Sequence, residues 1–387
     1  MPFNRPTEVG TESAYVAEAF ANAHLSGDGP FTHRCQQWLA DRSSVPDALL
    51  TPSCTAALDM SAILTDVGPG DEVIMPSFTF VSTANAFVLR GASPVFVDVK
   101  PGTLNIDEER VAEAVTERTK AIACVHYGGV PCAMDAIGAI AEDHGLFVVE
   151  DAAQALLSSY RGRPAGSLGD LAALSFHETK NVTCGEGGAL LLNDQRLIER
   201  AAVIRDKGTN RRQFDRGEVS RYTWVDIGSS FLLGEANAAF LWAQLEHAEE
   251  ITERRRAIWR RYHEAFEELE RRELVQRAVV PDECRHNGHL FHLILREAAW
   301  RAPVLARALE AGVHAVFHYV PLHSAPAGRR FGRVAGALPM TDQAGERLFR
   351  LPLWPDMANE DVEHVIATVI DAIVAVGAGA RVRAPAP

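Results

Sequence analysis

The chain has 387 residues, of which 47% are hydrophobic and 23% are charged, and its formal net charge at pH 7 is −13. This composition is that of a folded globular protein, and the length suits a large domain accompanied by a smaller one. The negative charge argues against binding to nucleic acid or to an anionic membrane surface. No apolar run is long enough to span a bilayer, and no basic segment followed by a short apolar one opens the sequence, so we expect a cytoplasmic protein.

Helical and extended patterns alternate along the first half of the chain. Residues 12–23 predict a helix, and the segment 27–30, Gly-Asp-Gly-Pro, interrupts the chain after it. Short apolar strands are expected at 72–76, 94–98, 121–125, 146–150, 171–176 and 189–193. Helices are expected between them at 56–67, 107–116 and 135–144. The alternation predicts an α/β fold with a mostly parallel sheet flanked by helices.

The second half begins with a long helical pattern. Residues 235–270 predict one amphipathic helix, because apolar side chains recur every three or four residues; a coiled coil is the alternative, but the heptads are not regular. Residues 288–295 predict a strand, which would send His289 and His292 to opposite faces, so no metal site is expected there. The last residues, 377–387, are rich in Ala, Gly, Pro and Arg and predict a mobile tail. The six cysteines show no paired spacing, which favours reduced thiols.

Lys180 lies in a tight connection between two expected strands, 171–176 and 189–193. Anchored at both ends, its amine would be held in a defined place, and the glycines at 185, 187 and 188 would let a ligand come close. A lysine in such a setting suits Schiff-base chemistry with a carbonyl compound. Taken alone, however, a lysine is far more often a solvated surface residue.

Two further features fit pyridoxal phosphate, which needs a carboxylate at its ring nitrogen and an anion site for its phosphate. Asp151 follows an apolar strand, at the edge where open α/β sheets bind ligands; alone, it could equally be a helix cap or a turn residue. Ser53 to Thr55 precede a helical pattern, where free backbone N–H groups and the helix dipole attract an anion. The alternative is that Ser53 or Thr55 only caps the helix.

Longer strings resemble the sugar-nucleotide aminotransferases of the DegT/DnrJ/EryC1/StrS family. The strings that carry the resemblance are Gly68–Val73, Pro76–Thr83, Asp151–Gln154 and Ser175–Asn181. Within the family, the chain is most similar to the dTDP-4-amino-4,6-dideoxygalactose transaminases in the strings Lys207–Arg211, Tyr222–Trp224 and Val316–His323. The resemblance implies a fold type I aminotransferase with a large cofactor-binding domain, residues 1–249, and a smaller C-terminal α+β domain, residues 250–376.

The resemblance also implies roles for individual residues. Lys180 would bond covalently to pyridoxal 5'-phosphate and then move the proton of the amino donor. The other cofactor-binding residues would be Asp151 at the pyridine nitrogen, Gln154 at the ring hydroxyl, Phe80 and Ala153 on the two ring faces, and Cys54, Thr55 and Ser175 at the phosphate. A place in the core is the alternative for Phe80. Many family members offer the phosphate an Asn from the neighbouring subunit, and Ser230 stands at that place here, as it does in the dideoxygalactose transaminases.

The implied reaction passes an amino group from L-glutamate to C4 of a dTDP-4-keto-6-deoxyhexose in a homodimer with composite active sites, and pyridoxamine 5'-phosphate stores the amine between the two halves. Candidate sugar-nucleotide contacts are Lys207, Arg211, Arg212, Arg216, His318, Tyr319 and His323. The basic ones could instead form a solvated, salt-bridged face, and Tyr319 and His323 could be structural. The alternatives are a 3-keto aminotransferase and a sugar dehydratase of the same fold, which has histidine in place of the lysine. A non-enzymatic regulator would not need Lys180, Asp151 and Gln154 together.

Overall fold

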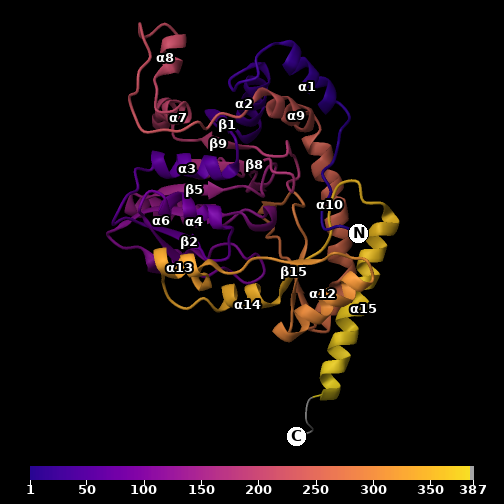
Figure 1. Ribbon diagram of the computed structural model, residues 1–387. Coiled ribbons are helices and arrows are strands. Elements are labelled where there is room, and N and C mark those ends of the chain that lie inside the picture. Colours follow the sequence, from indigo (N-terminus) through magenta and orange to yellow (C-terminus); the bar gives the residue numbers. More distant parts are fainter. Residues whose placement is uncertain (384–387) are drawn as a thin grey trace.

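The computed structural model of the protein describes residues 1–383, and an eight-stranded sheet forms its centre (Figure 1). The order of the strands is β1-β9-β8-β5-β4-β2-β3-β14. Their bounds are β1 Asp47–Thr51, β2 Glu72–Pro76, β3 Ser93–Val97, β4 Thr119–Val125, β5 Phe147–Asp151, β8 Leu171–Ser175, β9 Gly188–Leu192 and β14 Arg333–Val334. Only β9 forms antiparallel pairs in this sheet, with β1 and β8, among the described residues. The expected mostly parallel mixed sheet is therefore confirmed.

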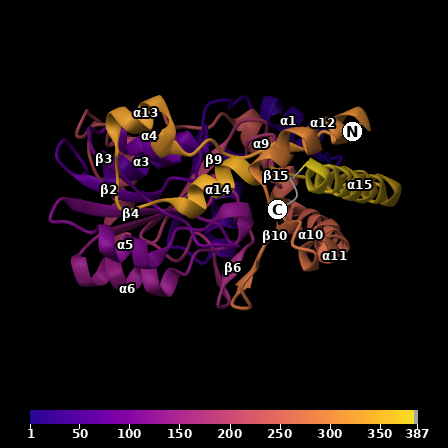
Figure 2. The same ribbon diagram turned by 90° about the horizontal axis from the view of Figure 1, so that it is seen from below.

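Helices cover both faces of this sheet, which explains why its parallel strands are apolar at almost every position. Alternate residues of β2 show the division, because Val73 and Met75 pack on one side and Ile74 on the other. The first side is covered by α3 Cys54–Leu64, α4 Val81–Val88 and α7 Ile198–Arg205, and the second by α5 Glu108–Ala114 and α6 Met134–His144. Figure 2 shows α3 and α4 above the strands and α5 and α6 below them. A third group, α1 Glu12–Ala21, α2 Pro30–Ser43 and α9 Glu235–Glu246, packs beside β1, β8 and β9.

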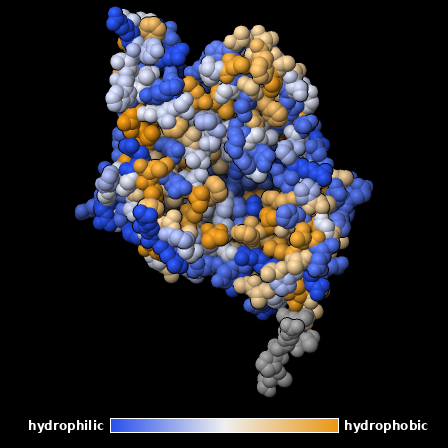
Figure 3. Space-filling model, viewed as in Figure 1, coloured by the Kyte–Doolittle hydropathy of each residue, from blue (hydrophilic) through white to orange (hydrophobic). Residues whose placement is uncertain are grey.

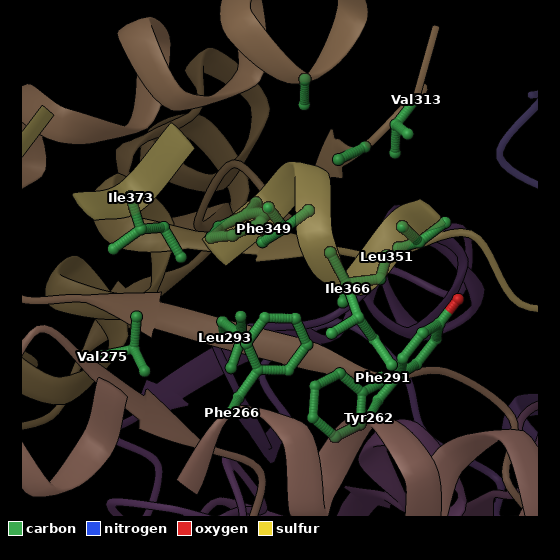
Figure 4. Close-up of a cluster of buried hydrophobic side chains, with 14 of the residues drawn as sticks. Tyr262, Phe266, Val275, Phe291, Leu293, Val313, Phe349, Leu351, Ile366 and Ile373 are labelled. Carbon is green, nitrogen blue, oxygen red and sulfur yellow. The ribbon is translucent and has the colours of Figure 1, made fainter. Parts of the chain in front are cut away.

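The C-terminal part has a four-stranded antiparallel sheet of its own, in the order β10-β12-β15-β13. Its strands are β10 Val275–Arg277, β12 His292–Leu295, β13 Val316–Phe317 and β15 Leu348–Arg350. The helices of this part are α10 Ala248–Ala265, α11 Glu267–Arg271, α12 Arg301–Glu310, α13 Pro326–Phe331, α14 Pro339–Arg347 and α15 Asn359–Arg383. Figure 4 shows how aromatic side chains, among them Tyr262 of α10, Phe291 just before β12 and Phe349 of β15, meet aliphatic ones of α15. A small sheet of β11 Cys284–Arg285, β6 Ser159–Tyr160 and β7 Arg163–Pro164 joins the two parts.

Two expectations about the second half need correction. The helix expected over 235–270 is divided into α9, α10 and α11, because His247 and Phe266 leave helical backbone geometry; α9 packs on the β1/β9 side and α10 packs on the C-terminal core. The strand expected from residue 288 begins only at His292, after Gly288 with its φ of +66°. The mobility expected of the tail, residues 377–387, stays a prediction: 377–383 are assigned to α15, and 384–387 lie outside the described residues.

The division at residues 249 and 250 stays a prediction. Two segments connect the parts across it. The strand β14, which follows the four-stranded sheet's β13 along the chain, pairs in parallel with β3 of the large sheet. At the other end of the chain, Met1 packs against the C-terminal core. Among the described residues, no helix is both long enough and apolar enough to cross a bilayer.

Glu72 links β2 of the large sheet to the edge strand β14. Its buried carboxylate accepts hydrogen bonds from Arg333 at 2.9 and 2.7 Å, from Arg118 at 2.5 Å and from Thr116 at 2.8 Å. The hydrogen bonds from Arg333, opposed by burial and helped by Arg118, lower the pKa of Glu72 from 4.5 to about 2. The stabilisation is therefore complete above pH 4.5 and is lost as the pH falls toward 2.

We expect Glu72→Gln to lower the free energy of unfolding at pH 7 by roughly 1–2 kcal/mol, a value reduced by the exposure of the two arginines. Urea unfolding at pH 7 and pH 3 measures the difference, which should shrink at the lower pH. Glu109→Gln, a change to an exposed acid of α5, is the control. An equal loss at both pH values would contradict the assignment.

Candidate active site

A cavity of about 700 Å³ lies where β5 and β8 end, against the C-terminal part of the chain. It collects ten residues that the sequence predicted for one site: Cys54, Thr55, Phe80, Asp151, Ala153, Gln154, Ser175, Lys180, His318 and Tyr319. These residues come from segments more than 260 positions apart, and the carboxyl ends of the parallel strands bring them to one edge of the sheet. The volume lies in the range of sites that enclose small ligands.

Asp151 is the last residue of β5 and is buried at the floor of the cavity. Thr83 donates its hydroxyl to one carboxylate oxygen at 2.6 Å, and the backbone N–H of Ala153 donates to the other at 3.2 Å. Thr79 in turn bonds Thr83 at 2.9 Å. The carboxylate is thus fixed in place while lone pairs remain for a protonated ring nitrogen.

Lys180 lies in the loop between the antiparallel strands β8 and β9. The pair Ser175 and Gly188 closes the ladder at the base of the loop, and the N–H of Lys180 donates to the carbonyl of His177 at 2.9 Å. Burial lowers the pKa of the Lys180 amine, although the nearby Cys54 and Asp151 oppose this shift. A lowered pKa increases the fraction of neutral amine, which is the nucleophilic and proton-accepting form.

The N-terminus of α3 faces the same cavity. Ser53 caps the helix, since its hydroxyl accepts the N–H of Ala56 at 3.1 Å, and Thr55 bonds Ser82 at 2.8 Å. Free N–H groups at a helix N-terminus attract an anion. Gly188 of β9 packs against this turn so closely that a Cβ there would lie 2.3 Å from the carbonyl carbon of Ser53.

We expect Gly188→Ala to displace the turn that begins α3 and to weaken cofactor binding about tenfold or more, because overpacking by one methyl group costs about 1–3 kcal/mol. Titration of the apoprotein with pyridoxal phosphate, followed by absorbance, measures the change. Gly185→Ala in the same loop is the steric comparison, since a Cβ at Gly185 meets no atom within 4 Å, although its φ of +82° strains the backbone. Unchanged affinity in Gly188→Ala would show that the turn does not hold the phosphate.

Gln154 connects the two parts of the chain at the cavity. Its side-chain oxygen accepts the N–H of Gly128 at 2.7 Å, and its amide nitrogen donates to the hydroxyl of Tyr319 at 3.1 Å. Tyr319 also packs edge-on against Phe78, with ring centroids 5.6 Å apart. Phe80 lines the cavity with 55% of its surface exposed, which excludes the alternative of a core residue and leaves its ring available for stacking.

Six predicted residues do not line the cavity of this chain. Five of them, four cations and Ser230, lie on a projection that we call the arm, residues 206–230, which is closed at its base by a bridge between Asp206 and Ser230 and contains α8 Arg211–Asp215 (Figure 1). The four pair with nearby acids: Lys207 with Asp206, Arg211 with Asp215, Arg212 with Asp47, and Arg216 with Glu199 and Glu218. Ser230 is exposed at the base of the arm. His323 bonds Ser77 at 2.8 Å and lies 3.2 Å from Asp342, outside the cavity.

Several cavity residues were not predicted for the site. They are Phe3, Asn4, Thr79, Ser82, Arg255, His289, Phe317 and Arg350. Thr79 and Ser82 lie in the string Pro76–Thr83, which resembles the family, as does the Thr83 that bonds Asp151. The resemblance therefore indicated this segment, but it gave no role to these three residues. No sequence pattern around Phe3 or Arg350 predicts a place in the site, because both reach the cavity only through the packing of the two ends of the chain.

The residues of the cavity fit pyridoxal phosphate, since a fixed carboxylate, a helix N-terminus and a buried amine surround one space of suitable size. The sequence matches the DegT/DnrJ/EryC1/StrS aminotransferase family over residues 6–370. The chain belongs to this family. It is therefore an aminotransferase with the fold type I architecture, and its cofactor is pyridoxal 5'-phosphate.

Proteins similar to this aminotransferase align with it over almost its full length. The spore coat polysaccharide biosynthesis protein SpsC of Bacillus subtilis is 35% identical over 96% of this chain and 97% of its own. The crystal structure of the aminotransferase TlmJ from Streptoalloteichus hindustanus is 33% identical, with a TM-score of 0.89 over 97% of this chain and 100% of that one. Spr1654 from Streptococcus pneumoniae in its PMP-form is 25% identical, with a TM-score of 0.90 over 97% of this chain and 100% of that one.

Proposed function

We propose that this aminotransferase transfers an amino group from L-glutamate to C4 of a dTDP-4-keto-6-deoxyhexose, giving a dTDP-4-amino-4,6-dideoxyhexose. The observation that carries the proposal is that Lys180, Asp151 and Gln154 line one cavity. The strings Val316–His323 and Lys207–Arg211, which resemble the transaminases of this sugar, support the choice of acceptor. A role in polysaccharide biosynthesis, printed in the name of SpsC, agrees with a sugar substrate. We also propose that the enzyme works in the cytoplasm, as the sequence led us to expect.

The residues of the cavity divide the work of the reaction. When bound, pyridoxal phosphate supplies an electron sink for the carbon that loses its proton. Asp151 would hold the charge of the pyridine nitrogen, Gln154 would hold the ring hydroxyl, and Phe80 and Ala153 would hold the ring between them. The Lys180 amine would take the proton from the α-carbon of the amino donor and pass it to the cofactor. In the second half of the reaction, the same amine would take a proton from the amine-bearing carbon of the cofactor and deliver it to C4 of the sugar.

We also propose a homodimer in which the arm of one subunit completes the cavity of the other. The arm carries exposed apolar side chains: Phe214, Tyr222, Trp224, Val225 and Ile227. Trp224 is 77% exposed, which is unusual for a large aromatic residue and typical of an interaction surface. In Figure 3 hydrophobic patches lie among hydrophilic residues over the viewed face. The cations of the arm, Lys207, Arg211, Arg212 and Arg216, would then bind the diphosphate of the sugar nucleotide, and Ser230 would approach the cofactor phosphate.

The test is to incubate the purified enzyme with dTDP-4-keto-6-deoxyglucose, L-glutamate and pyridoxal phosphate. We expect one equivalent of 2-oxoglutarate for each aminated sugar, with nitrogen at C4 in the NMR spectrum. Lys180→Ala is the negative control. Product from the 3-keto isomer alone would remove the substrate assignment, and elimination of a hydroxyl without amination would identify a dehydratase, which Lys180 disfavours.

A further inference from the structure

His289 lines the cavity with one of its ring nitrogens free. Its Nδ1 lies 3.1 Å from Oδ1 of Asn181, the residue that follows Lys180 in the chain. Among the described residues, its Nε2 has no hydrogen-bond partner, and it is not one of the unpaired atoms that are sealed from solvent. The free nitrogen can therefore be reached from the cavity.

Neighbouring contacts fix which nitrogen of His289 carries the proton. The amide nitrogen of Asn181 donates to the backbone carbonyl of Asn287 at 3.0 Å, so the amide oxygen of Asn181 faces the imidazole. An amide oxygen only accepts hydrogen bonds, and Nδ1 of His289 must therefore be the N–H donor. In a neutral imidazole the other nitrogen, Nε2, then carries a lone pair and no proton.

The surroundings of His289 keep its imidazole neutral. Burial lowers the pKa of His289 well below its usual range, and the positive charges of Lys180, Arg255 and Arg350 lower it further. These three cations line the same cavity and donate hydrogen bonds without accepting them. Nε2 of His289 thus differs from them, because it offers an uncharged acceptor to a ligand.

His289 is held in place from two sides. The Oδ1 of Asn287 accepts the backbone N–H of His289 at 3.0 Å. The Nδ2 of Asn287 donates to the carbonyls of Gln154 and Leu156 at 2.8 and 2.9 Å, which ties this segment to the end of β5. From the other side, Arg255 of α10 donates to the carbonyl of His289 at 2.6 Å. An acceptor fixed in this way discriminates between ligands, since an unmatched ligand leaves it unpaired.

We propose that Nε2 of His289 accepts a hydrogen bond from the C3 hydroxyl of the sugar, an inference that rests on the proposed function and names the residue that requires this hydroxyl. Carbon C4 must approach the Lys180 amine, because that amine delivers its proton, and His289 bonds the residue next to Lys180. Of the two ring carbons beside C4, C5 carries a methyl group in a 6-deoxyhexose and C3 carries a hydroxyl. Only the hydroxyl can donate to an unprotonated nitrogen.

The experiment isolates the sugar half of the reaction. Enzyme in the pyridoxamine form is mixed with dTDP-4-keto-6-deoxyglucose or with its 3-deoxy analogue, and the return of the visible cofactor band gives the rate with each sugar. Wild type should favour the parent sugar roughly 10-fold to 100-fold, because the analogue leaves Nε2 without a donor. His289→Phe keeps a ring but no acceptor and should treat the two sugars alike within threefold. His289→Gln, whose amide oxygen can take the place of Nε2, should recover part of the preference.

Two comparisons separate recognition of the hydroxyl from a structural effect. His292→Phe is the matched control, since His292 is a buried histidine of the same segment, lies outside the cavity and has no hydrogen-bond partner among the described residues. It should keep the wild-type preference. In His289→Phe, reaction of the pyridoxal form with L-glutamate alone should change less than threefold. An equal loss with both sugars, or a donor half slowed as much as the sugar half, would show that His289 only holds the loop of Lys180 and would overturn the proposal.

Identification of the product by NMR distinguishes two kinds of failure. If wild type forms no sugar aminated at C4, the proposed function fails and the assignment of His289 falls with it. If wild type forms that sugar but does not favour it over the 3-deoxy analogue, or if His289→Phe keeps the preference, the assignment of His289 alone fails.

Discussion

Lys180→Ala is expected to lower the rate of amino transfer roughly 10⁴-fold or more, since the substitution removes both the covalent anchor of the cofactor and the group that moves the proton. The amine lies in the same cavity as Asp151, and its lowered pKa favours the neutral form that both tasks need. The measurement is single-turnover loss of the visible cofactor band with L-glutamate. In wild type, borohydride should also fix the cofactor to the peptide that contains residue 180, as mass spectrometry would show.

Two further measurements separate chemistry from folding. Lys120→Ala, at an exposed lysine of β4, should keep the wild-type rate. Ethylamine added to Lys180→Ala should restore part of the proton transfer, because the shortened side chain leaves space for a small amine. Full transaminase turnover by Lys180→Ala would show that the assigned base is wrong.

Asp151→Asn is expected to slow the donor half of the reaction roughly 10²–10³-fold, the usual effect of removing one fixed electrostatic partner from an active site. The amide keeps the shape of the carboxylate but cannot hold the ring nitrogen in its protonated state, so the cofactor accepts electron density less well. Single-turnover kinetics measures the rate, and a titration with pyridoxal phosphate measures cofactor affinity separately.

The hydrogen bond from Thr83 to Asp151 at 2.6 Å supplies a graded comparison. Thr83→Val should reduce the rate less than Asp151→Asn does, because the carboxylate remains but loses one of its positioning contacts. Asp135→Asn, at an acid on the surface, should leave the rate unchanged. A rate for Asp151→Asn within threefold of wild type would refute the pairing of this residue with the ring nitrogen.

The sequence predicted those parts of the fold and site that depend on local pattern. The strands β2, β3, β4, β5, β8 and β9 were recognised because each is a short apolar run with turn residues beside it. Asp151 was recognised because it stands at the end of such a run, and Lys180 because it lies in the connection between two of them. The carboxyl ends of parallel strands share one edge, which is why both residues were expected in one place.

Other parts depend on contacts that no local pattern records. The break at His247 follows from the packing of α9 and α10 against different cores, whereas the apolar spacing continues through it. Arg350 reaches the cavity because β15 pairs with β12 and β13, and Phe3 because the start of the chain folds back onto the C-terminal part. The cations of the arm were grouped by sequence distance, but the arm projects from the body of this chain.

The position of β14 has a consequence for the folding of this chain during translation. Without the edge strand β14, the large sheet ends at β3, which is complete by residue 97, whereas β14 comes from residues 333 and 334. During translation the unpaired edge of β3 stays open while more than two hundred further residues are added, and exposed edges of this kind invite association between nascent chains. Ribosome-bound fragments that stop before residue 333 should therefore depend on chaperones more than the finished polypeptide does.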